Sequence, residues 1–102
     1  MKLFLQHEIR EAKEHAAAGG QALHVHRILP NRVTAPRCFV AAIDRGEKIA
    51  HLFDQDFDRL CATCRRLGVR VLKVEHRGED GQHVDLCAGP LRKAIEEAEK
   101  IK

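Results

Sequence analysis

The chain has 102 residues, a formal net charge of +3, 44% hydrophobic residues and 32% charged residues. This length predicts a single domain over residues 1–102, and the mild basic excess excludes a dedicated duplex-binding tail while leaving weak attraction to nucleic-acid phosphates open. Four Phe without any Trp or Tyr predict an aliphatic core and argue against modules that stack bases on exposed aromatic rings.

The sequence has no apolar run of the roughly 18 residues that a membrane-spanning helix needs. Residues 1–5 resemble the start of a signal peptide, but the polar residues 6–8 end the apolar run too soon for one. We therefore expect a cytoplasmic protein. In that compartment its four cysteines are expected to be free thiols or metal ligands rather than disulfides.

In chain order, the first predicted element is a helix over residues 5–18, ended by Gly19-Gly20. Its apolar stripe consists of Leu5, Ile9, Ala12 and Ala16. Residues 23–29 then alternate as in a strand, which sets His24 and His26 on one face. Residues 30–37, which contain two prolines, form a loop or an irregular edge.

The middle of the chain predicts a β-hairpin followed by a helix. The apolar run 38–43 suits a buried strand, residues 44–47 supply turn chemistry, and residues 48–53 return as the partner strand. Residues 55–67 then carry apolar side chains at helical spacing, after an Asp N-cap at Asp54 or Asp56 and before a glycine that ends the helix.

The last part of the chain predicts two strands and a helix. Residues 69–75 are a strong β candidate, so we expect a right-handed crossover that joins this strand in parallel to the one before the helix. Residues 77–81 form a polar turn that leads into a strand at 83–87. Gly89-Pro90 opens the last helix, predicted over residues 90–101.

Together these elements predict a single α+β domain. It has a mixed sheet of about five strands, with helices near residues 5–18, 55–67 and 90–101 packed on one or both faces. An aliphatic core of this size gives modest stability, so we also expect a homodimer that buries an edge strand.

One short segment carries three chemically active side chains at alternate positions. His83, Asp85 and Cys87 occupy positions i, i+2 and i+4, so an extended strand would set them on one face together. An imidazole, a carboxylate and a thiol are all ligands for divalent transition metals. The spacing therefore predicts a metal site made of these three residues.

His51 is the second residue of interest, because it lies near the end of the strand at 48–53. If the strand at 83–87 lies beside it, then His51, His83 and Asp85 converge, and Asp85 can orient an imidazole for acid–base work or share a metal with it. These three residues are the predicted catalytic groups. In the alternative interpretation, His83 and Asp85 form a hydrogen-bonded pair that only holds the neighbouring turn.

Two further groups allow metal binding but have simpler interpretations. His24 and His26 share a strand face, which is more often the solvated side of an edge strand. Cys61 and Cys64, with His83 and Cys87, have the spacing of a zinc site. However, both helical cysteines fall on the apolar stripe, where a buried free Cys acts as a small hydrophobic residue. We interpret His7 and His15 as surface residues.

Part of the chain resembles a known family. An apolar strand ends in acid at Asp44, a His-Leu-Phe-Asp segment at 51–54 precedes a helix that ends in Leu-Gly, and a His-x-Asp-Leu segment at 83–86 runs into the basic helix start 91–93. In these features residues 38–101 resemble a small bacterial domain family of uncharacterised function. The resemblance implies no activity, and it singles out Asp44, His51, His83 and Asp85.

Residues 84–90 also resemble a segment of the threonyl-tRNA synthetase editing domain. In that family a His follows the Pro and acts with the Cys and a separate His-x3-His pair. Here Leu91 stands in place of that His, and the sequence contains no His-x3-His pair. The editing activity is therefore not carried over to this chain.

Two functions follow as hypotheses. The first is a non-enzymatic binding or interaction module that works through an oligomer surface, a protein partner or a weakly basic face. The second is a small hydrolase, dependent on a divalent metal or on acid–base groups, that acts on a phosphate-containing substrate through His51, His83 and Asp85.

Overall fold

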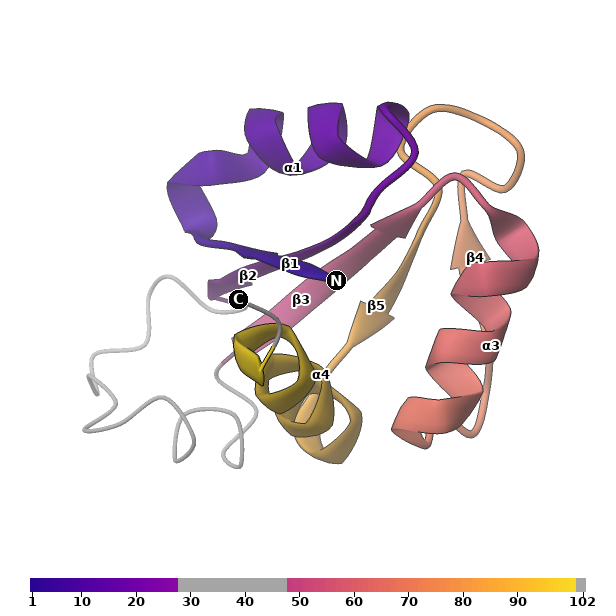
Figure 1. Cartoon of the computed structure of the whole chain (residues 1–102). Coiled ribbons are helices and arrows are strands. Elements are labelled where there is room, and N and C mark those ends of the chain that lie inside the picture. The colour runs from indigo at the N-terminus through magenta and orange to yellow at the C-terminus, as the bar shows by residue number, and fades with distance from the viewer. Residues whose placement is uncertain (28–47, 101–102) are drawn as a thin grey trace.

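The computed structural model describes residues 1–27 and 48–100, which form a mixed sheet with helices on both sides (Figure 1). In chain order the elements are β1 (Lys2–Phe4), η1 (Gln6–Glu8, a 3-10 helix), α1 (Ile9–Ala17), β2 (Gln21–Arg27), β3 (Lys48–Asp54), α3 (Phe57–Leu67), β4 (Val74–Glu75), β5 (His83–Leu86) and α4 (Ala88–Lys100). The predicted α+β class, with three α-helices and five strands, is confirmed for the described residues.

The strand order in the sheet is β1-β2-β3-β5-β4. β1 and β2 are parallel and are joined through α1, whereas the other neighbouring strands are antiparallel. Within the described residues, none of the helices has the length and apolar character of a membrane span.

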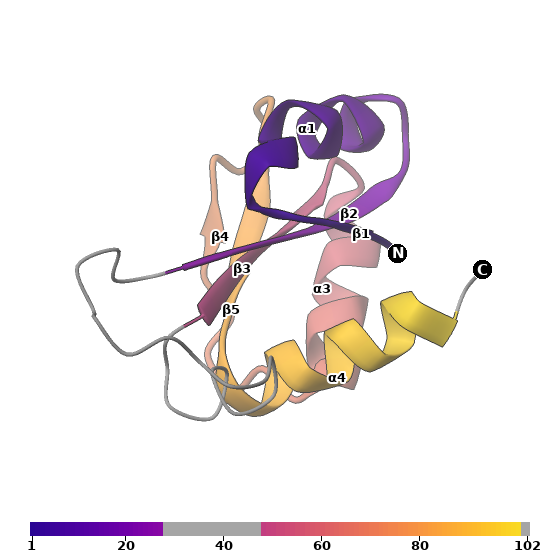
Figure 2. The ribbon, with the colours of Figure 1, turned by 90° about the vertical axis from the view of Figure 1, so that its left-hand side faces the viewer.

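Alternation along the strands gives the sheet two different faces. α3 and α4 pack on one face (Figure 2), against buried side chains from the three central strands, namely Leu23, Val25, Ala50, Leu52, Val84 and Leu86. We call this the core face. α1 packs on the opposite face in a smaller cluster, which consists of Phe4, Ala12, Ala16, Ala22 and Phe53.

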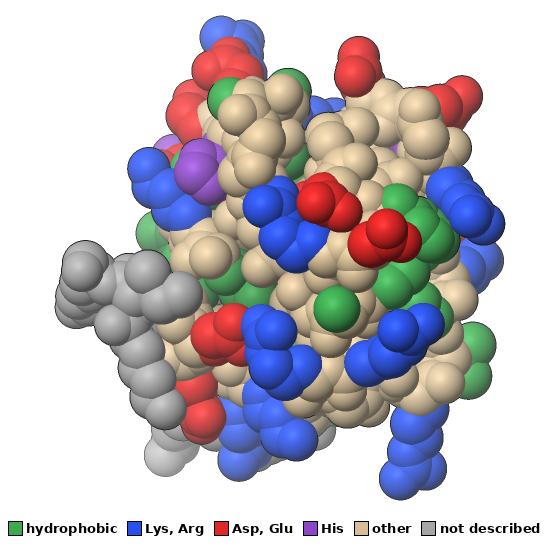
Figure 3. Space-filling model, turned by 45° about the vertical axis from the view of Figure 1, so that its right-hand side comes forward, with side chains coloured by type: hydrophobic (Ala, Val, Ile, Leu, Met, Phe, Trp, Pro, Cys, Tyr) green, Lys and Arg blue, Asp and Glu red, His purple; other side chains and the backbone are tan. Residues whose placement is uncertain are grey.

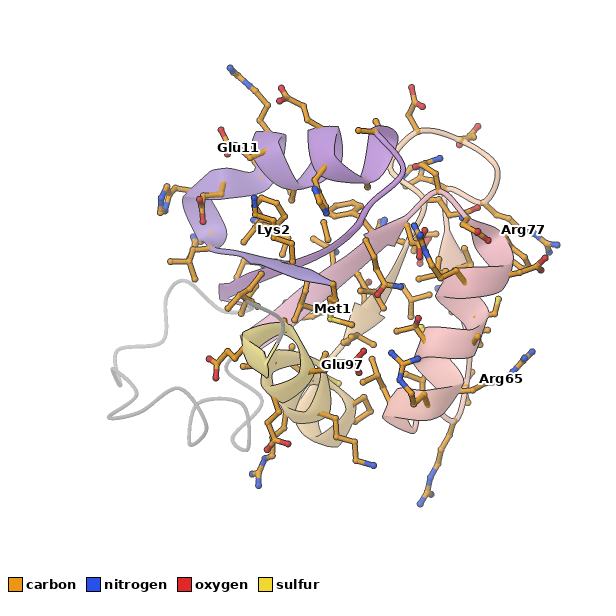
Figure 4. All side chains as sticks on the ribbon, viewed as in Figure 1. Met1, Lys2, Glu11, Arg65, Arg77 and Glu97 are labelled. Atoms are coloured by element: carbon orange, nitrogen blue, oxygen red, sulfur yellow. The ribbon has the colours of Figure 1, made fainter. Side chains whose placement is uncertain are left out.

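The N-terminal strand β1 was not predicted, because three residues are too few to show an alternating pattern. Figure 4 shows Met1 on the side of α4 and Lys2 on the side of α1, as a strand requires. Lys2 Nζ lies 5.3 Å from the centre of the Phe4 ring. In the predicted first helix, Ala12 and Ala16 are buried as expected, but Leu5 and Ile9 are exposed, since η1 occupies the first turn.

The helix predicted at 55–67 is confirmed as α3. The Asp56 side chain accepts a hydrogen bond from the backbone N–H of Arg59 at 3.0 Å, which caps the N-terminus. Gly68 ends the helix with φ +90°, a left-handed conformation that glycine adopts without strain. α4 likewise matches the helix predicted at 90–101, although it begins two residues earlier.

The strand predicted at 69–75 is largely wrong. Only Val74–Glu75 is a strand, and it pairs antiparallel with β5 at the sheet edge rather than parallel with β3. The expected crossover is therefore absent between these described strands. Val69, Leu72 and Val74 pack against the core cluster, but Val71 is 83% exposed. Apolar packing without a paired neighbouring strand does not make a strand.

A buried carboxylate fixes the junction between β3 and α3. The Asp54 side chain is fully buried and accepts two hydrogen bonds from the Arg59 guanidinium, each 2.7 Å long. The same guanidinium donates to the backbone carbonyls of Gly19 and Gly20. Such bidentate, charge-assisted pairing offsets the cost of burying the charge. The turn after α1 is thereby held against the end of β3.

Basic side chains are spread over the side of the molecule that carries α3. Figure 3 shows Lys and Arg there with Asp and Glu among them, rather than in one continuous stripe. Arg66 of α3 forms an ion pair with Glu97 of α4. The side chain of Arg77 lies over the Phe57 ring, at 4.1 Å from its centre.

Several predictions fall outside the described residues. These are the loop at 30–37, the strand at 38–43 with the turn at 44–47, the end of the strand predicted at 23–29, and Asp44.

Candidate metal centre

The face of the sheet opposite the core face carries a row of polar side chains, which we call the histidine face: His24, His26, His51, His83 and Asp85. They are the alternate residues of β2, β3 and β5. The register aligns His24 with His51, and His51 with Asp85. Because directly opposed side chains on neighbouring strands are in contact, the pairing brings these groups together.

His51 lies at the centre of this face and uses both of its ring nitrogens. Nδ1 donates to Oδ1 of Asp85 at 2.7 Å. Nε2 lies 3.0 Å from Nε2 of His26, within hydrogen-bond distance. The carboxylate therefore fixes the orientation of the His51 ring and directs its Nε2 lone pair toward His26.

His24 is the most deeply buried of the histidines on this face, with 4% of its surface exposed. Its Nε2 lies 3.1 Å from the backbone carbonyl of Gln6. Because a carbonyl oxygen only accepts, Nε2 carries the hydrogen, and in the neutral ring the lone pair is then on Nδ1. That Nδ1 atom is buried and has no hydrogen-bond partner among residues 1–27 and 48–100. Buried polar atoms are rarely left without a partner.

Two groups of potential ligands meet on the histidine face. His24, His26 and His51 each offer one ring nitrogen, and these atoms lie within 4.8 Å of one another. His51, His83 and Asp85 form a second group by the same distance. With Zn–N bonds of about 2.0–2.1 Å, tetrahedral ligand nitrogens lie about 3.3 Å apart. The ring nitrogens must therefore move closer together to bind one ion. The rings of His24 and His51 are stacked, with centroids 5.9 Å apart and planes 5° from parallel, so their side chains must also rotate before both lone pairs point at that ion.

The protonation states favour metal binding at the first group. Burial lowers the pKa of His24, against the opposing hydrogen bond to Gln6. Burial also lowers the pKa of His51, against the opposing hydrogen bond to Asp85. Both rings are therefore held in the neutral form, which is the form of imidazole that binds metals.

His83 has a different set of contacts. Its Nδ1 donates to the backbone carbonyl of Gly81 at 2.7 Å, so it holds the turn before β5. The alternative interpretation assigned this role to a hydrogen bond between His83 and Asp85 instead. Nε2 of His83 faces Oδ1 of Asp85 at 3.4 Å. The ring also meets the His51 ring edge-on, with centroids 4.7 Å apart.

The structure thus brings together the three predicted catalytic residues, His51, His83 and Asp85. It does not add the third predicted metal ligand, Cys87, to them. Cys87 is exposed and lies beyond the end of β5, and in the described part of the chain no metal-capable group includes it. The alternation that aligns residues 83 and 85 ends before residue 87.

The two cysteines of α3 lie on the other side of the sheet from His83. Cys61 and Cys64 are buried, and Cys64 belongs to the cluster on the core face. Burial raises the pKa of the Cys64 thiol to about 11, with a smaller contribution from Cys61. The zinc site considered for these cysteines is not formed in the described residues, and they pack as small hydrophobic residues.

The interpretation of His24 as part of the solvated side of an edge strand is wrong, whereas His26 is partly exposed and lies past the pairing with β1. β2 lies between β1 and β3, which buries His24. The alternation in sequence predicted that these histidines share a face. How deeply they are buried depends on which strands pair with β2, and those strands are distant in sequence. His7 is exposed as expected, whereas His15 is half-buried, with its ring centre 5.7 Å from that of Phe4.

Comparisons with family models, curated proteins and solved structures give no match to this chain.

Proposed function

We propose that this chain is a non-enzymatic binding module that holds one divalent transition-metal ion, Zn²⁺ in the first instance, on its histidine face. The ligands are His24 Nδ1, His26 Nε2 and His51 Nε2. The observation that supports this most strongly is the buried Nδ1 of His24, which has no partner among the described residues and whose tautomer is set by Gln6. A metal ion satisfies that lone pair.

The surroundings of the three histidines support the same proposal. Histidine ligands of metals usually donate their second ring N–H to a carboxylate or a backbone carbonyl, which fixes the tautomer and the ring orientation. His51 donates to Asp85 and His24 to the Gln6 carbonyl. Three protein ligands leave the fourth tetrahedral position to water or a small ligand. The module can therefore present a metal-bound ligand.

The test is metal binding by purified protein that carries no His tag. After chelator treatment we expect one tight equivalent of Zn²⁺ by calorimetry and elemental analysis. Co²⁺ should give the visible absorption of a tetrahedral site. Loss of a residue that only hydrogen-bonds to a metal ligand weakens metal binding by about 10–100-fold. His26→Gln and His51→Gln each remove a ligand itself, so each should weaken Zn²⁺ binding by more than that.

The matched control is His7→Gln, which changes an exposed histidine outside both groups and should bind as the wild type does. Circular dichroism checks that each variant is folded. Absence of tight binding by the wild type, or full binding by folded His26→Gln and His51→Gln, would overturn the proposal.

A second candidate function is a metal- or acid–base-dependent hydrolase acting on a phosphate-containing substrate. It is favoured by one observation, the contact of Asp85 with both His51 and His83. Chromogenic phosphate mono- and diesters are suitable substrates for the test. Turnover that Asp85→Asn reduces by about 10²-fold or more would support it, since positioned acid–base groups contribute about 10²–10⁴-fold. Equal rates for both proteins would exclude it.

The expected partners remain predictions. A homodimer or a protein partner would cover a sheet edge, and β1 and β4 are the edge strands of the described sheet. Light scattering during size-exclusion chromatography measures the mass. Weak nucleic-acid binding through scattered basic residues should weaken with salt, because phosphate contacts release counterions. Retention on nucleic acid that is unaffected by salt would contradict it.

A further inference from the structure

The two ligand groups on the histidine face share one residue. His51 directs Nε2 toward His26 and Nδ1 toward Asp85, so each group contacts a different nitrogen of the same ring. An imidazole ring with a ligand set at each nitrogen can bridge two metal ions. No other residue in the described part of the chain belongs to both groups.

The second group also contains an imidazole nitrogen and a carboxylate oxygen that lie close together. Because Nδ1 of His83 donates to the Gly81 carbonyl, Nε2 is the ring nitrogen that is left for a further partner. That nitrogen faces the Asp85 oxygen at 3.4 Å. A metal ion can bind to an imidazole nitrogen and a carboxylate oxygen at this separation after a small adjustment of the side chains. The side chain of His83 is 12% exposed and that of Asp85 is 44% exposed, so the second group is open to an ion from solvent.

We propose that the histidine face holds a second divalent metal ion, bound by His51 Nδ1, His83 Nε2 and Asp85 Oδ1, so that His51 bridges a two-metal centre. This inference rests on the proposed function, since the first ion is the one at His24, His26 and His51. Imidazole and carboxylate ligands suit Zn²⁺ and Cu²⁺. The two ions would be about 6 Å apart, which is two metal–nitrogen bonds plus the width of the ring.

The second ion replaces a proton. The hydrogen that Nδ1 of His51 donates to Asp85 is released to solvent when the metal–nitrogen bond forms, and the bridging ring becomes an imidazolate. The negative charges of the imidazolate and of Asp85 partly offset the four positive charges of the two ions. Because the bridge must lose a proton, the second ion should bind more weakly than the first.

The experiment titrates the full chain, free of tags and treated with chelator, with Zn²⁺ alone. Two equivalents are expected, the second weaker than the first. His83→Gln should lose the second equivalent and keep the first, because His83 is outside the first group. The matched control, His76→Gln, changes an exposed neighbour of His83 that belongs to neither group, and it should keep both equivalents.

A second measurement uses Cu²⁺ and paramagnetic resonance. Two Cu²⁺ ions joined by an imidazolate couple antiferromagnetically, so the signal should rise with the first equivalent and fall with the second. In His83→Gln the fall should be absent. A single equivalent of Zn²⁺, or a second equivalent that survives in His83→Gln, would overturn this inference while leaving the proposed function intact. Failure of even the first equivalent would overturn the proposed function itself.

Discussion

The two faces of the sheet are built from the same three strands but serve different ends. On the core face, Leu52 and its neighbours are packed against α3 and α4. On the opposite face, His51 and its neighbours form a network of ring nitrogens and a carboxylate. Residues adjacent in sequence thus contribute to separate properties, since alternation sends one side chain to the core and the next to the polar site.

The faces also differ in how their polar atoms are satisfied. The buried carboxylate of Asp54 accepts hydrogen bonds from Arg59, Gln21 and the Asp56 backbone. On the histidine face, by contrast, Nδ1 of His24 is buried without a partner in the described part of the chain. The Asp54 carboxylate is thus paired inside the fold, whereas Nδ1 of His24 can still accept a ligand.

The comparison is tested most strongly by changing adjacent residues of β3. Leu52→Ala should lower the free energy of unfolding by about 2–5 kcal/mol, because it leaves a cavity in a fully buried site. The molecules that remain folded should bind Zn²⁺ with the same stoichiometry. Urea denaturation and calorimetry measure the two effects. His51→Gln should instead lose Zn²⁺ binding, with a smaller change in the free energy of unfolding. Equal destabilisation by Leu52→Ala and His51→Gln would contradict the separate roles of the two faces.

Zn²⁺ itself should stabilise the fold through the histidine face. A ligand that binds only the folded chain adds about 2.7 kcal/mol when its free concentration is 100 times its dissociation constant. Thermal unfolding with and without Zn²⁺ measures this. The same Zn²⁺ concentration should give little stabilisation to His26→Gln and full stabilisation to His7→Gln. A uniform response of all three proteins would indicate nonspecific binding.

Lower pH should destabilise the chelator-treated chain. Burial lowers the pKa of His15, His24 and His51 in the folded protein. The unfolded chain, with ordinary pKa values of about 6.5, therefore binds more protons. Stability is retained above pH 6.5 and is lost as the pH falls through 6.5 toward the lowered values. Urea midpoints at pH 8 and pH 5.5 measure the loss, and His24→Gln should reduce it. A urea midpoint that rises on acidification would contradict the lowered pKa values of these histidines.

Thiol labelling of the cysteines reports whether the core face opens in the folded protein. In a Cys38→Ser background, Cys87 should react readily with a thiol reagent at pH 8. Cys64 should react only on unfolding, because it is buried, and a pKa of about 11 leaves roughly one thiol in a thousand ionised. Mass spectrometry of the labelled peptides identifies the site. Rapid labelling of Cys64 in the folded protein would show that the core face opens.

The fold was predictable where a local signal was complete. α3 has an apolar stripe, an Asp cap and a terminal Gly, and each agrees with the structure. The segment at 69–75 has β-forming residues, but β5 is already paired with β3 along one edge, and its other edge pairs only with Val74 and Glu75. The local composition of residues 69–75 does not reveal that only two of these residues pair with β5.

The site was half predictable for a similar reason. Period-two spacing placed His83 with Asp85, and His24 with His26, on shared faces, and the predicted approach of His51 to Asp85 is confirmed. The sequence did not reveal that the two pairs meet across β3. That meeting depends on β2 and β5 pairing with opposite edges of β3, and these pairings join strands that are distant in sequence.

The strict side-to-side alternation of β3 has a consequence for how this gene can change in length. Deleting or inserting one residue within Lys48–Asp54 would rotate every later side chain of the strand by half a turn. If the change precedes residue 51, the His51 side chain would point to the core face and the Leu52 side chain to the histidine face. We therefore expect single-residue indels inside this strand to abolish folding and metal uptake together, whereas length changes in the turn at residues 77–81 should be better tolerated.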